Sequence, residues 1–229
     1  MKVAIIPARG GSKRIPRKNI KIFCEKPMIA YSIEAAIKSK LFDRVIVSTD
    51  DEEIAEVAKQ YGAEVPFMRP PELSDDHTAT IPVIAHAIAE LHKEGPVEIA
   101  CCIYATAPFI RVQYLQEAYE TLIESKSLYS FSATSFSFPI QRAIKINDQH
   151  QVEMFQPENF TTRSQDLEEA YHDAGQFYFG TSEAWLNSEP IFSKHSTAVI
   201  LPRHLVQDID TLEDFRRAEL MFKVLEDDA

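Results

Sequence analysis

The sequence predicts an α/β fold in which a mainly parallel sheet carries helices on both faces. Short apolar, β-branched runs alternate with segments of helical periodicity from residue 2 to residue 134. Alternation at this spacing is typical of parallel strands joined by helices. The chain has 229 residues, of which 45% are hydrophobic. That size suits one domain spanning residues 1–229.

The first part of the chain contains five expected strands and four expected helices. Each strand is a short run rich in β-branched residues, and each helix repeats apolar residues every three or four positions, as Ile81, Ile84 and Ile88 do. Gly62 is expected to form the C-terminal cap of its helix. The expected strands cover residues 2–6, 44–50, 64–68, 98–104 and 130–134, and the expected helices cover residues 27–39, 51–62, 80–92 and 112–125.

The pattern changes between approximately residues 137 and 170, where apolar residues are scattered among polar ones and no helical period fits. We interpret this segment as an inserted arm that leaves the main body. Its apolar residues need cover, which suggests a partner subunit, although a surface excursion folded back on its own domain is the alternative. Strands at 176–179 and 197–201 are expected next. A helix over 211–226 then closes the chain, with Thr211 and Asp214 as its capping signature.

The composition excludes several classes of protein. A net charge of -11 argues against nucleic acid or an anionic membrane as a partner. No run of 18 apolar residues is present, and the N-terminal apolar stretch is too short for a signal peptide. Cys24, Cys101 and Cys102 lack the spacing of a zinc site and form no disulfide framework. We therefore expect reduced thiols in a cytoplasmic protein.

A basic, glycine-containing loop follows the first expected strand. Residues 9–21 include six basic residues and no acidic one. Glycines allow backbone N–H groups to approach phosphate oxygens closely, and lysine and arginine neutralise their charge. The loop lacks the G-K-[ST] ending of a Walker loop, which counts against an ATPase. It also lacks the G-x-G-x-x-G pattern, which counts against an NAD-dependent dehydrogenase. The candidate phosphate-binding residues are Arg9, Gly10, Gly11, Ser12, Lys13 and Lys18.

A second constellation, Asp208-Ile209-Asp210, lies before the last expected helix. In extended chain, residues i and i+2 point the same way, so the two carboxylates can converge on one cation. Hard oxygen ligands beside a phosphate favour Mg²⁺. The alternative is that one aspartate caps the helix and the other is solvated.

Three segments together resemble the acylneuraminate cytidylyltransferase family: residues 9–19, Arg69-Pro70-Pro71-Glu72-Leu73 and Asp208-Ile209-Asp210-Thr211. The resemblance extends over nearly the whole chain. It implies a Rossmann-like sheet, CTP as the nucleotide donor and Mg²⁺ as the cofactor. It also implies a homodimer in which a small inserted dimerisation arm crosses to the other subunit's active site.

The resemblance also implies residue roles. Lys18 matches the catalytic lysine, and Asp208 and Asp210 match the metal-binding pair. The implied nucleotide-binding residues are Arg9, Gly10, Gly11, Ser12, Lys13, Asn19, Arg69 and Thr80. The implied sugar-binding residues are Tyr104, Arg142, His172, Gln176, Tyr178 and, less directly, Phe192.

Two stretches depart from the sialic acid enzymes of this family. Residues 104–109 read Tyr-Ala-Thr-Ala-Pro-Phe instead of a Q-P-T-S-P stretch, and residues 171–178 read Tyr-His-Asp-Ala-Gly-Gln-Phe-Tyr instead of F-R-P-N-G-A-I-Y. Both look like the pseudaminic acid branch, which implies CMP transfer to a nine-carbon acidic sugar for bacterial surface or flagellar glycans. A cytidylyltransferase for N-acetylneuraminic, legionaminic or 3-deoxy-octulosonic acid is the alternative, and a non-catalytic nucleotide-binding sensor is the rival of another class.

Overall fold

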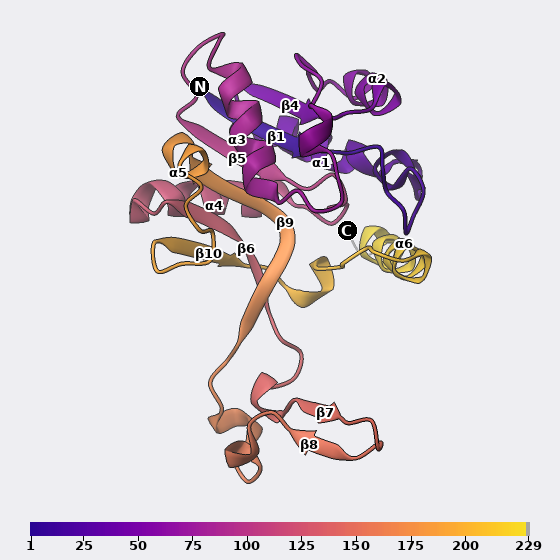
Figure 1. Cartoon of the computed structure of the whole chain (residues 1–229), viewed down its shortest axis with the longest axis vertical. Helices are drawn as coiled ribbons and strands as arrows, with labels where there is room; N and C mark the ends of the chain where they lie inside the picture. The colour runs from indigo at the N-terminus through magenta and orange to yellow at the C-terminus, as the bar shows by residue number, and fades with distance from the viewer. Residues whose placement is uncertain (228–229) are drawn as a thin grey trace.

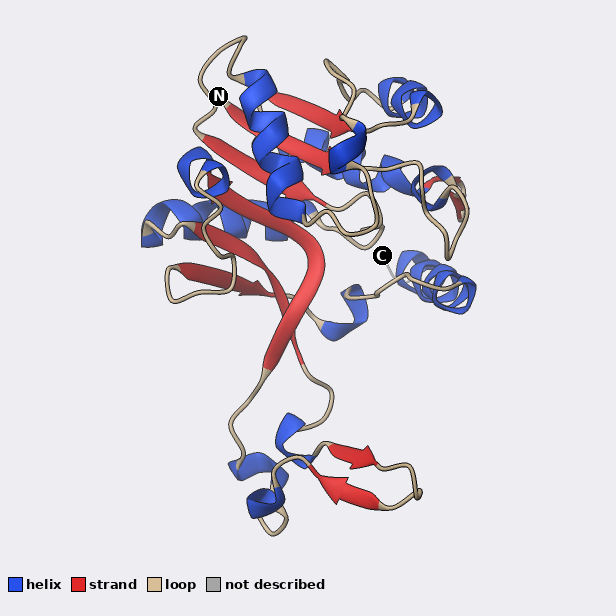
Figure 2. Cartoon of the chain, viewed as in Figure 1, coloured by secondary structure: helices blue, strands red, loops and turns tan. Residues whose placement is uncertain are grey.

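A computed structural model describes residues 1–227 and contains a six-stranded sheet with the order β10-β6-β9-β5-β1-β4 (Figures 1 and 2). The neighbouring pairs are parallel except at β9, which runs antiparallel to both β5 and β6. The strands are β1 (Lys2–Pro7), β4 (Arg44–Ser48), β5 (Ile99–Ile103), β6 (Tyr129–Ser135), β9 (Tyr171–Thr181) and β10 (Ser196–Ile200). The predicted α/β class with a mainly parallel sheet is confirmed.

Helices cover both faces of this sheet because the central strands are apolar on both sides. On β1, Ala4 and Ile6 face a core shared with α1 (Met28–Ser39), α2 (Glu52–Gln60) and α4 (Val112–Ser125). Val3 and Ile5 face the other core, which is shared with α3 (Thr80–Leu91) and α5 (Ser182–Leu186). The continuous apolar run of β1 therefore fills two layers.

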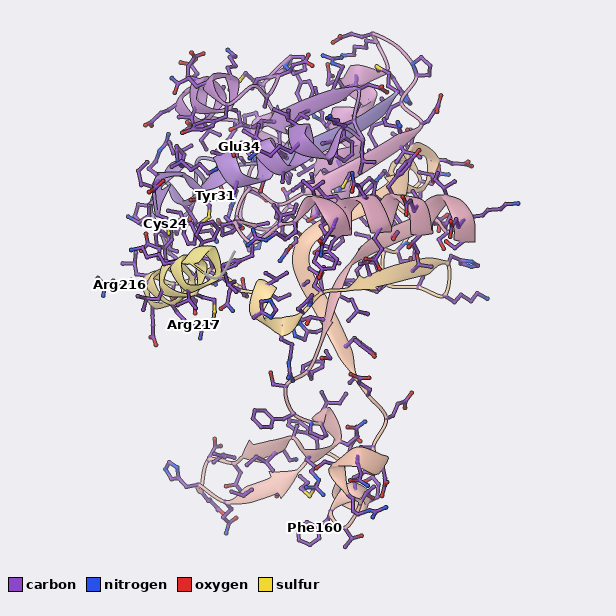
Figure 3. The ribbon with its side chains drawn as sticks, turned by 180° about the vertical axis from the view of Figure 1, so that it is seen from behind. Cys24, Tyr31, Glu34, Phe160, Arg216 and Arg217 are labelled. Atoms are coloured by element: carbon purple, nitrogen blue, oxygen red, sulfur yellow. The ribbon has the colours of Figure 1, made fainter. Side chains whose placement is uncertain are left out.

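A third apolar cluster packs the last helix, α6 (Leu212–Asp227), against the hairpin of β2 (Ile22–Phe23) and β3 (Lys26–Pro27). The Phe23 ring makes edge contacts with Phe215 and Phe222 at centroid distances of 5.5 and 5.4 Å. Figure 3 shows Cys24 and Tyr31 beside this helix. Ile15 and Ile209 join the same cluster, so it ties the segment before α6 to the loop after β1.

The segment between β6 and β9 projects from the sheet as an arm, as Figures 1 and 2 show. It carries the hairpin of β7 (Ile144–Ile146) and β8 (Val152–Met154). Its apolar side chains are exposed, and the labelled Phe160 lies at its far end in Figure 3. The short 3₁₀ helices of the chain are η1 (Lys18–Ile20), η2 (Pro71–Leu73), η3 (Ile140–Arg142), η4 (Pro157–Asn159), η5 (Ser164–Asp166) and η6 (Arg203–Leu205).

Several local predictions can be compared with the structure. The strand expected at 64–68 is wrong: only a single bridge joins Glu64 to Ile46, and Pro66 has no N–H with which to continue the ladder. Gly62 has φ of 93° just after α2, as its capping role requires. The cap of α6 is confirmed, because Thr211 N donates to Asp214 Oδ2 over 2.9 Å and Asp214 N donates to the Thr211 hydroxyl over 3.2 Å.

The structure also bears on the membrane segments and the cysteines that the sequence analysis considered. Within residues 1–227, no helix is long and apolar enough to cross a bilayer. Cys101 and Cys102 are buried side by side in β5, where burial raises the pKa of both thiols and keeps them protonated.

Candidate active site

A pocket of about 510 Å³ opens where β1 and β5 end. Ligands of open α/β sheets bind at this edge. Three segments line the pocket: the loop after β1, the stretch that leads into α3, and the turn after β5. Lining residues that the sequence singled out are Arg9, Ser12, Lys13, Lys18, Asn19, Arg69, Thr80 and Tyr104.

The loop after β1 is held in place by its own side chains and by the end of β4. The Gly10 N–H donates to Asp50 Oδ1 over 3.0 Å, and Asn19 Nδ2 donates to the Arg9 carbonyl over 2.9 Å. Arg17 forms a two-point contact with Asp51, at 2.5 and 2.9 Å. The loop is thus preorganised, and the Gly10 N–H is already committed to a carboxylate.

Asp51 links this loop to α2. Besides pairing with Arg17, its carboxylate caps the helix by accepting from Ile54 N over 3.0 Å. The hydrogen bond from Arg17 is the main cause that lowers the Asp51 pKa to about 2, and the helix-capping bonds add to it. The carboxylate is therefore ionised at all ordinary pH values.

The segment Asp208-Ile209-Asp210 contacts the basic loop, although most of the sequence separates the two. Lys18 Nζ donates to the Ile209 carbonyl over 2.8 Å and lies 3.4 Å from Asp210 Oδ1. Arg14 donates to Asp210 Oδ2 over 2.7 Å. Ile209 is buried whereas Asp208 is exposed and Asp210 half-buried, so the two aspartates share the side that faces away from the core. The structure brings together the two segments that the sequence analysis singled out.

Asp208 and Asp210 offer hard oxygen donors, and in the described residues the Asp208 carboxylate makes no hydrogen bond or ion pair. Across residues 1–227 no group of three or more histidine, cysteine or acidic side chains is arranged to hold a metal ion. Magnesium is commonly held by one or two carboxylates together with substrate phosphates and water. The donor set therefore fits a divalent cation that arrives with a phosphate ligand.

Asp76 is a pocket residue that sequence reasoning missed. Its carboxylate accepts from Arg9 over 2.6 Å and also pairs with Lys13, so it sits on two candidate phosphate-binding cations. Its only sequence signal is its place in a polar stretch between Arg69 and the start of α3, which many loops share.

Arg69 lines the same pocket, with only 3% of its side chain exposed. Its Nε donates to the Ser74 hydroxyl, while Nη2 is buried without a hydrogen-bond partner in the described chain and lies 3.7 Å from Asp50. Burial is the main cause that lowers its pKa. An unpaired buried donor beside a pocket is rare and is suited to a ligand acceptor.

Tyr104 forms part of the pocket wall, and Tyr178 of β9 packs behind it. The Tyr104 hydroxyl shares a 2.9 Å hydrogen bond with Thr80, and its ring lies 5.3 Å from that of Tyr178. The Tyr178 hydroxyl donates to Asp173 Oδ2 over 2.5 Å. Burial, with help from Tyr104 and Asp173, raises the Tyr178 pKa, so this hydroxyl remains a donor.

The remaining candidates lie outside the pocket in a single chain. Gln176 is buried and its amide donates to the Leu205 carbonyl over 2.6 Å. His172 is exposed and packs edge-on against Phe136. Arg142 is on the arm, where it donates to the Thr162 carbonyl, and Phe192 packs on Phe131. Arg142 does not line this pocket.

Comparisons with known proteins identify the family and the fold of the chain. A family model described as cytidylyltransferase matches residues 3–223. A pseudaminic acid cytidylyltransferase of Campylobacter jejuni is 52% identical, covering 97% of this chain and 96% of that protein. An N-acylneuraminate cytidylyltransferase of Escherichia coli is 31% identical, covering 94% of this chain and 51% of that protein. A solved structure titled as CMP:2-keto-3-deoxy-manno-octonic acid synthetase complexed with CTP has a TM-score of 0.71 at 16% identity, covering 98% of this chain and 99% of that one, and shows the same fold.

Proposed function

The chain belongs to the cytidylyltransferase family, and from this premise we propose that it transfers CMP from CTP to the anomeric hydroxyl of pseudaminic acid. The hydroxyl oxygen bonds to the α-phosphorus, the bond from the α-phosphorus to the bridging oxygen breaks, and pyrophosphate leaves. The hydroxyl proton is released in the same step. One observation carries the proposal: Lys18 and Arg14 of the basic loop both contact Asp210 at the edge of one pocket.

The nucleotide side of the pocket is built for a polyanion. Arg9, Lys13 and Lys18 line it from one segment, and Arg69 adds a buried Nη2 donor that has no hydrogen-bond partner in the described chain. Preorganised cations of this kind stabilise charge that develops on a transferring phosphoryl group. In the proposed reaction Lys18 offsets charge on the departing pyrophosphate, held in place by its hydrogen bond to the Ile209 carbonyl.

Asp208 and Asp210 are proposed to hold a divalent cation, for which Mg²⁺ is the expected ion. When bound, such an ion neutralises phosphate charge and lowers the pKa of a coordinated hydroxyl. To bind the ion, the Asp210 carboxylate would give up part of its contact with Arg14 and Lys18. These two basic side chains would then be free to contact the phosphates.

The sugar side of the site is proposed to be completed by a second copy of the chain. Support comes from the arm, where Phe138, Ile146, Phe155 and Phe160 are each more than 60% exposed. Exposed apolar surface on a projecting segment needs cover. Arg142 lies on the arm and does not line the pocket of the single chain. In such a homodimer it is the proposed clamp for the sugar carboxylate.

The test is pyrophosphate release from CTP and Mg²⁺ with a panel of acidic sugars. We expect the highest kcat/KM with pseudaminic acid, and lower values with N-acetylneuraminic, legionaminic and 3-deoxy-octulosonic acid. A preference for one of the other sugars would move the chain to another branch of the family. CTP binding without pyrophosphate release from any sugar would instead support a nucleotide sensor.

Lys18→Ala tests the catalytic lysine within this assay. We expect kcat to fall about 10²- to 10³-fold, because one preorganised charge stabiliser is lost. Lys21→Ala is the matched control, since Lys21 belongs to the same basic segment but lies over the Phe215 ring, 5.5 Å from its centroid, and outside the pocket. Equal turnover by the two variants would remove Lys18 from the mechanism.

A further inference from the structure

Strand β9 is irregular where it passes the pocket wall. Its partner β6 advances two residues, from Phe131 to Ala133, while β9 advances five, from Tyr178 to Asp173. In a regular strand, residues five positions apart would lie about 16 Å apart and point to opposite faces. Here the Asp173 carboxylate and the Tyr178 hydroxyl are 2.5 Å apart. The bulge therefore turns Asp173 back beside Tyr178, and bulges next to active sites commonly re-aim a side chain.

The bulge is stabilised by its own set of hydrogen bonds. Gly175 has φ of 63°, a conformation that favours glycine, and its N–H donates to Asp173 Oδ1 over 2.9 Å. The Ser132 hydroxyl accepts from the N–H groups of Gln176 and Phe177, which the irregular ladder would otherwise leave unpaired. Both oxygens of Asp173 are thus fixed, one by a backbone donor and one by a buried tyrosine.

Tyr178 connects Asp173 to the pocket wall, because it contacts Asp173 through its hydroxyl and Tyr104 through its ring. The Tyr178 ring packs against Tyr104, which lines the pocket and bonds to Thr80. Asp173 itself is exposed, so its carboxylate lies at the surface just beyond this wall. The basic loop and Asp210 lie on the nucleotide side, where the phosphates are proposed to bind. The edge of the pocket next to Tyr104 and Asp173 is therefore the side on which the acceptor sugar is expected.

We propose that Asp173 determines the orientation and selection of the sugar, by accepting a hydrogen bond from a hydroxyl or an amide N–H of the acidic substrate. This inference rests on the proposed function and assigns one contact of the acceptor subsite. A carboxylate can only accept hydrogen bonds, and it repels a second carboxylate. Asp173 therefore turns the acid group of the sugar away from this wall. Tyr178 is a positioning residue that acts through Asp173.

The experiment compares Asp173→Asn, Tyr178→Phe and the double variant with the unaltered protein. At saturating CTP we expect the sugar KM to rise about 10-fold or more in Asp173→Asn, because the charged acceptor is replaced by a neutral amide in which one acceptor oxygen becomes a donor. The CTP KM stays within about twofold, since the carboxylate does not reach the nucleotide side. Tyr178→Phe gives a smaller rise and adds nothing in the Asp173→Asn background, because Tyr178 acts only through the Asp173 carboxylate. Glu120→Gln is the control for loss of one negative charge, on the exposed side of α4.

Two sugars identify the donor: an N-acylated nonulosonic acid, and an analogue with hydroxyls in place of its acylamino groups. A KM that rises only for the N-acylated sugar assigns an amide N–H, and a rise for both assigns a hydroxyl; either result supports the proposal. Unchanged sugar KM values overturn it. A CTP KM that rises in step with the sugar KM also overturns it, because the change would then reflect a general loss of structure.

Failure of the proposed function is recognised separately, as absence of pyrophosphate release by the unaltered protein with every sugar. In that event calorimetric titration of the sugar into protein loaded with a non-cleavable CTP analogue still tests Asp173. Weaker sugar binding by Asp173→Asn than by Glu120→Gln supports the inference. Equal binding by the two variants, or no binding by the unaltered protein, overturns it.

Discussion

Gly10 and Gly11 are adjacent in the basic loop but differ in their surroundings, and substitution of each by alanine tests how the loop is held. A Cβ atom on Gly10 would lie 2.6 Å from Asp51 Oδ2 and 3.1 Å from its Cβ and Cγ. A Cβ atom on Gly11 would meet no heavy atom within 4 Å. The two variants therefore add the same methyl group to a crowded position and to an open one.

The cost of Gly10→Ala follows from what Asp51 would lose by moving. Its carboxylate caps α2 through Ile54 N and pairs with Arg17 at two points. Loss of a helix cap costs about 1 kcal/mol, and a half-exposed ion pair contributes about another 1 kcal/mol at most. We expect the free energy of unfolding to fall by about 2 kcal/mol, or about 4–8 °C in Tm for a domain of this size. Gly11→Ala should stay within about 0.5 kcal/mol of the unaltered protein.

The assay is urea unfolding followed by the fluorescence of Trp185, the single tryptophan, which is fully buried beside Tyr129. It reports global unfolding from a site outside the basic loop. Equal stability of the two alanine variants would refute the reasoning, since it would mean that Asp51 moves aside at no cost. A larger loss in Gly11→Ala would show that the open side of the loop is occupied in solution.

Two further predictions concern carboxylates around the same loop. Asp76 pairs with Arg9 and Lys13, the proposed phosphate ligands, so Asp76→Asn should tighten inhibition by pyrophosphate about fivefold at low salt and less at high salt. Weaker inhibition than in the Glu72→Gln control would show that Asp76 assists binding instead. Because the folded-state pKa of Asp51 is lowered from 3.8 to about 2, its contribution to stability is present above pH 4 and is lost as the pH falls through about 2. Acid titration of the free energy of unfolding should therefore show a loss of about 1–2 kcal/mol between pH 4 and pH 2 that is absent in Asp51→Asn, and parallel curves for the two proteins would contradict the assignment.

Local sequence patterns predicted the elements that are defined by local periodicity. The helices at residues 80–92 and 112–125, the cap of Thr211 and Asp214 and the glycine after α2 all depend on residues within a few positions of one another. The prediction of a strand at 64–68 was wrong because it relied on the apolar pattern and gave too little weight to Pro66, which has no N–H to donate to a ladder. Helix α5, which follows β9, was not predicted because its five residues are too few to show a helical period.

The site was predictable to the extent that its residues lie in recognisable segments. The basic loop and the aspartate pair each have a composition that indicates phosphate or metal chemistry, and the structure brings them into contact. Asp173 stood out only as part of the stretch 171–178 that departs from the sialic acid enzymes, and Asp76 gave no comparable signal. The first is brought beside Tyr178 by a bulge whose hydrogen bonds come from Ser132 on another strand, and the second finds Arg9 across 67 positions. Such contacts are made by tertiary packing, which periodicity does not encode.

The ion pairs of the basic loop suggest how an acidic protein binds a polyanion. Each basic side chain that contacts the site from this loop already has a carboxylate partner: Asp76 serves Arg9 and Lys13, and Asp210 serves Arg14 and Lys18. Binding of the proposed metal-bound triphosphate would then be an exchange of partners, in which phosphate oxygens replace protein carboxylates on the basic side chains. Because exposed pairs are weak, this exchange costs little, and the cations are held near the required positions beforehand. The affinity gained should therefore depend on the number of phosphate oxygens that replace a carboxylate, which favours a triphosphate over a monophosphate product.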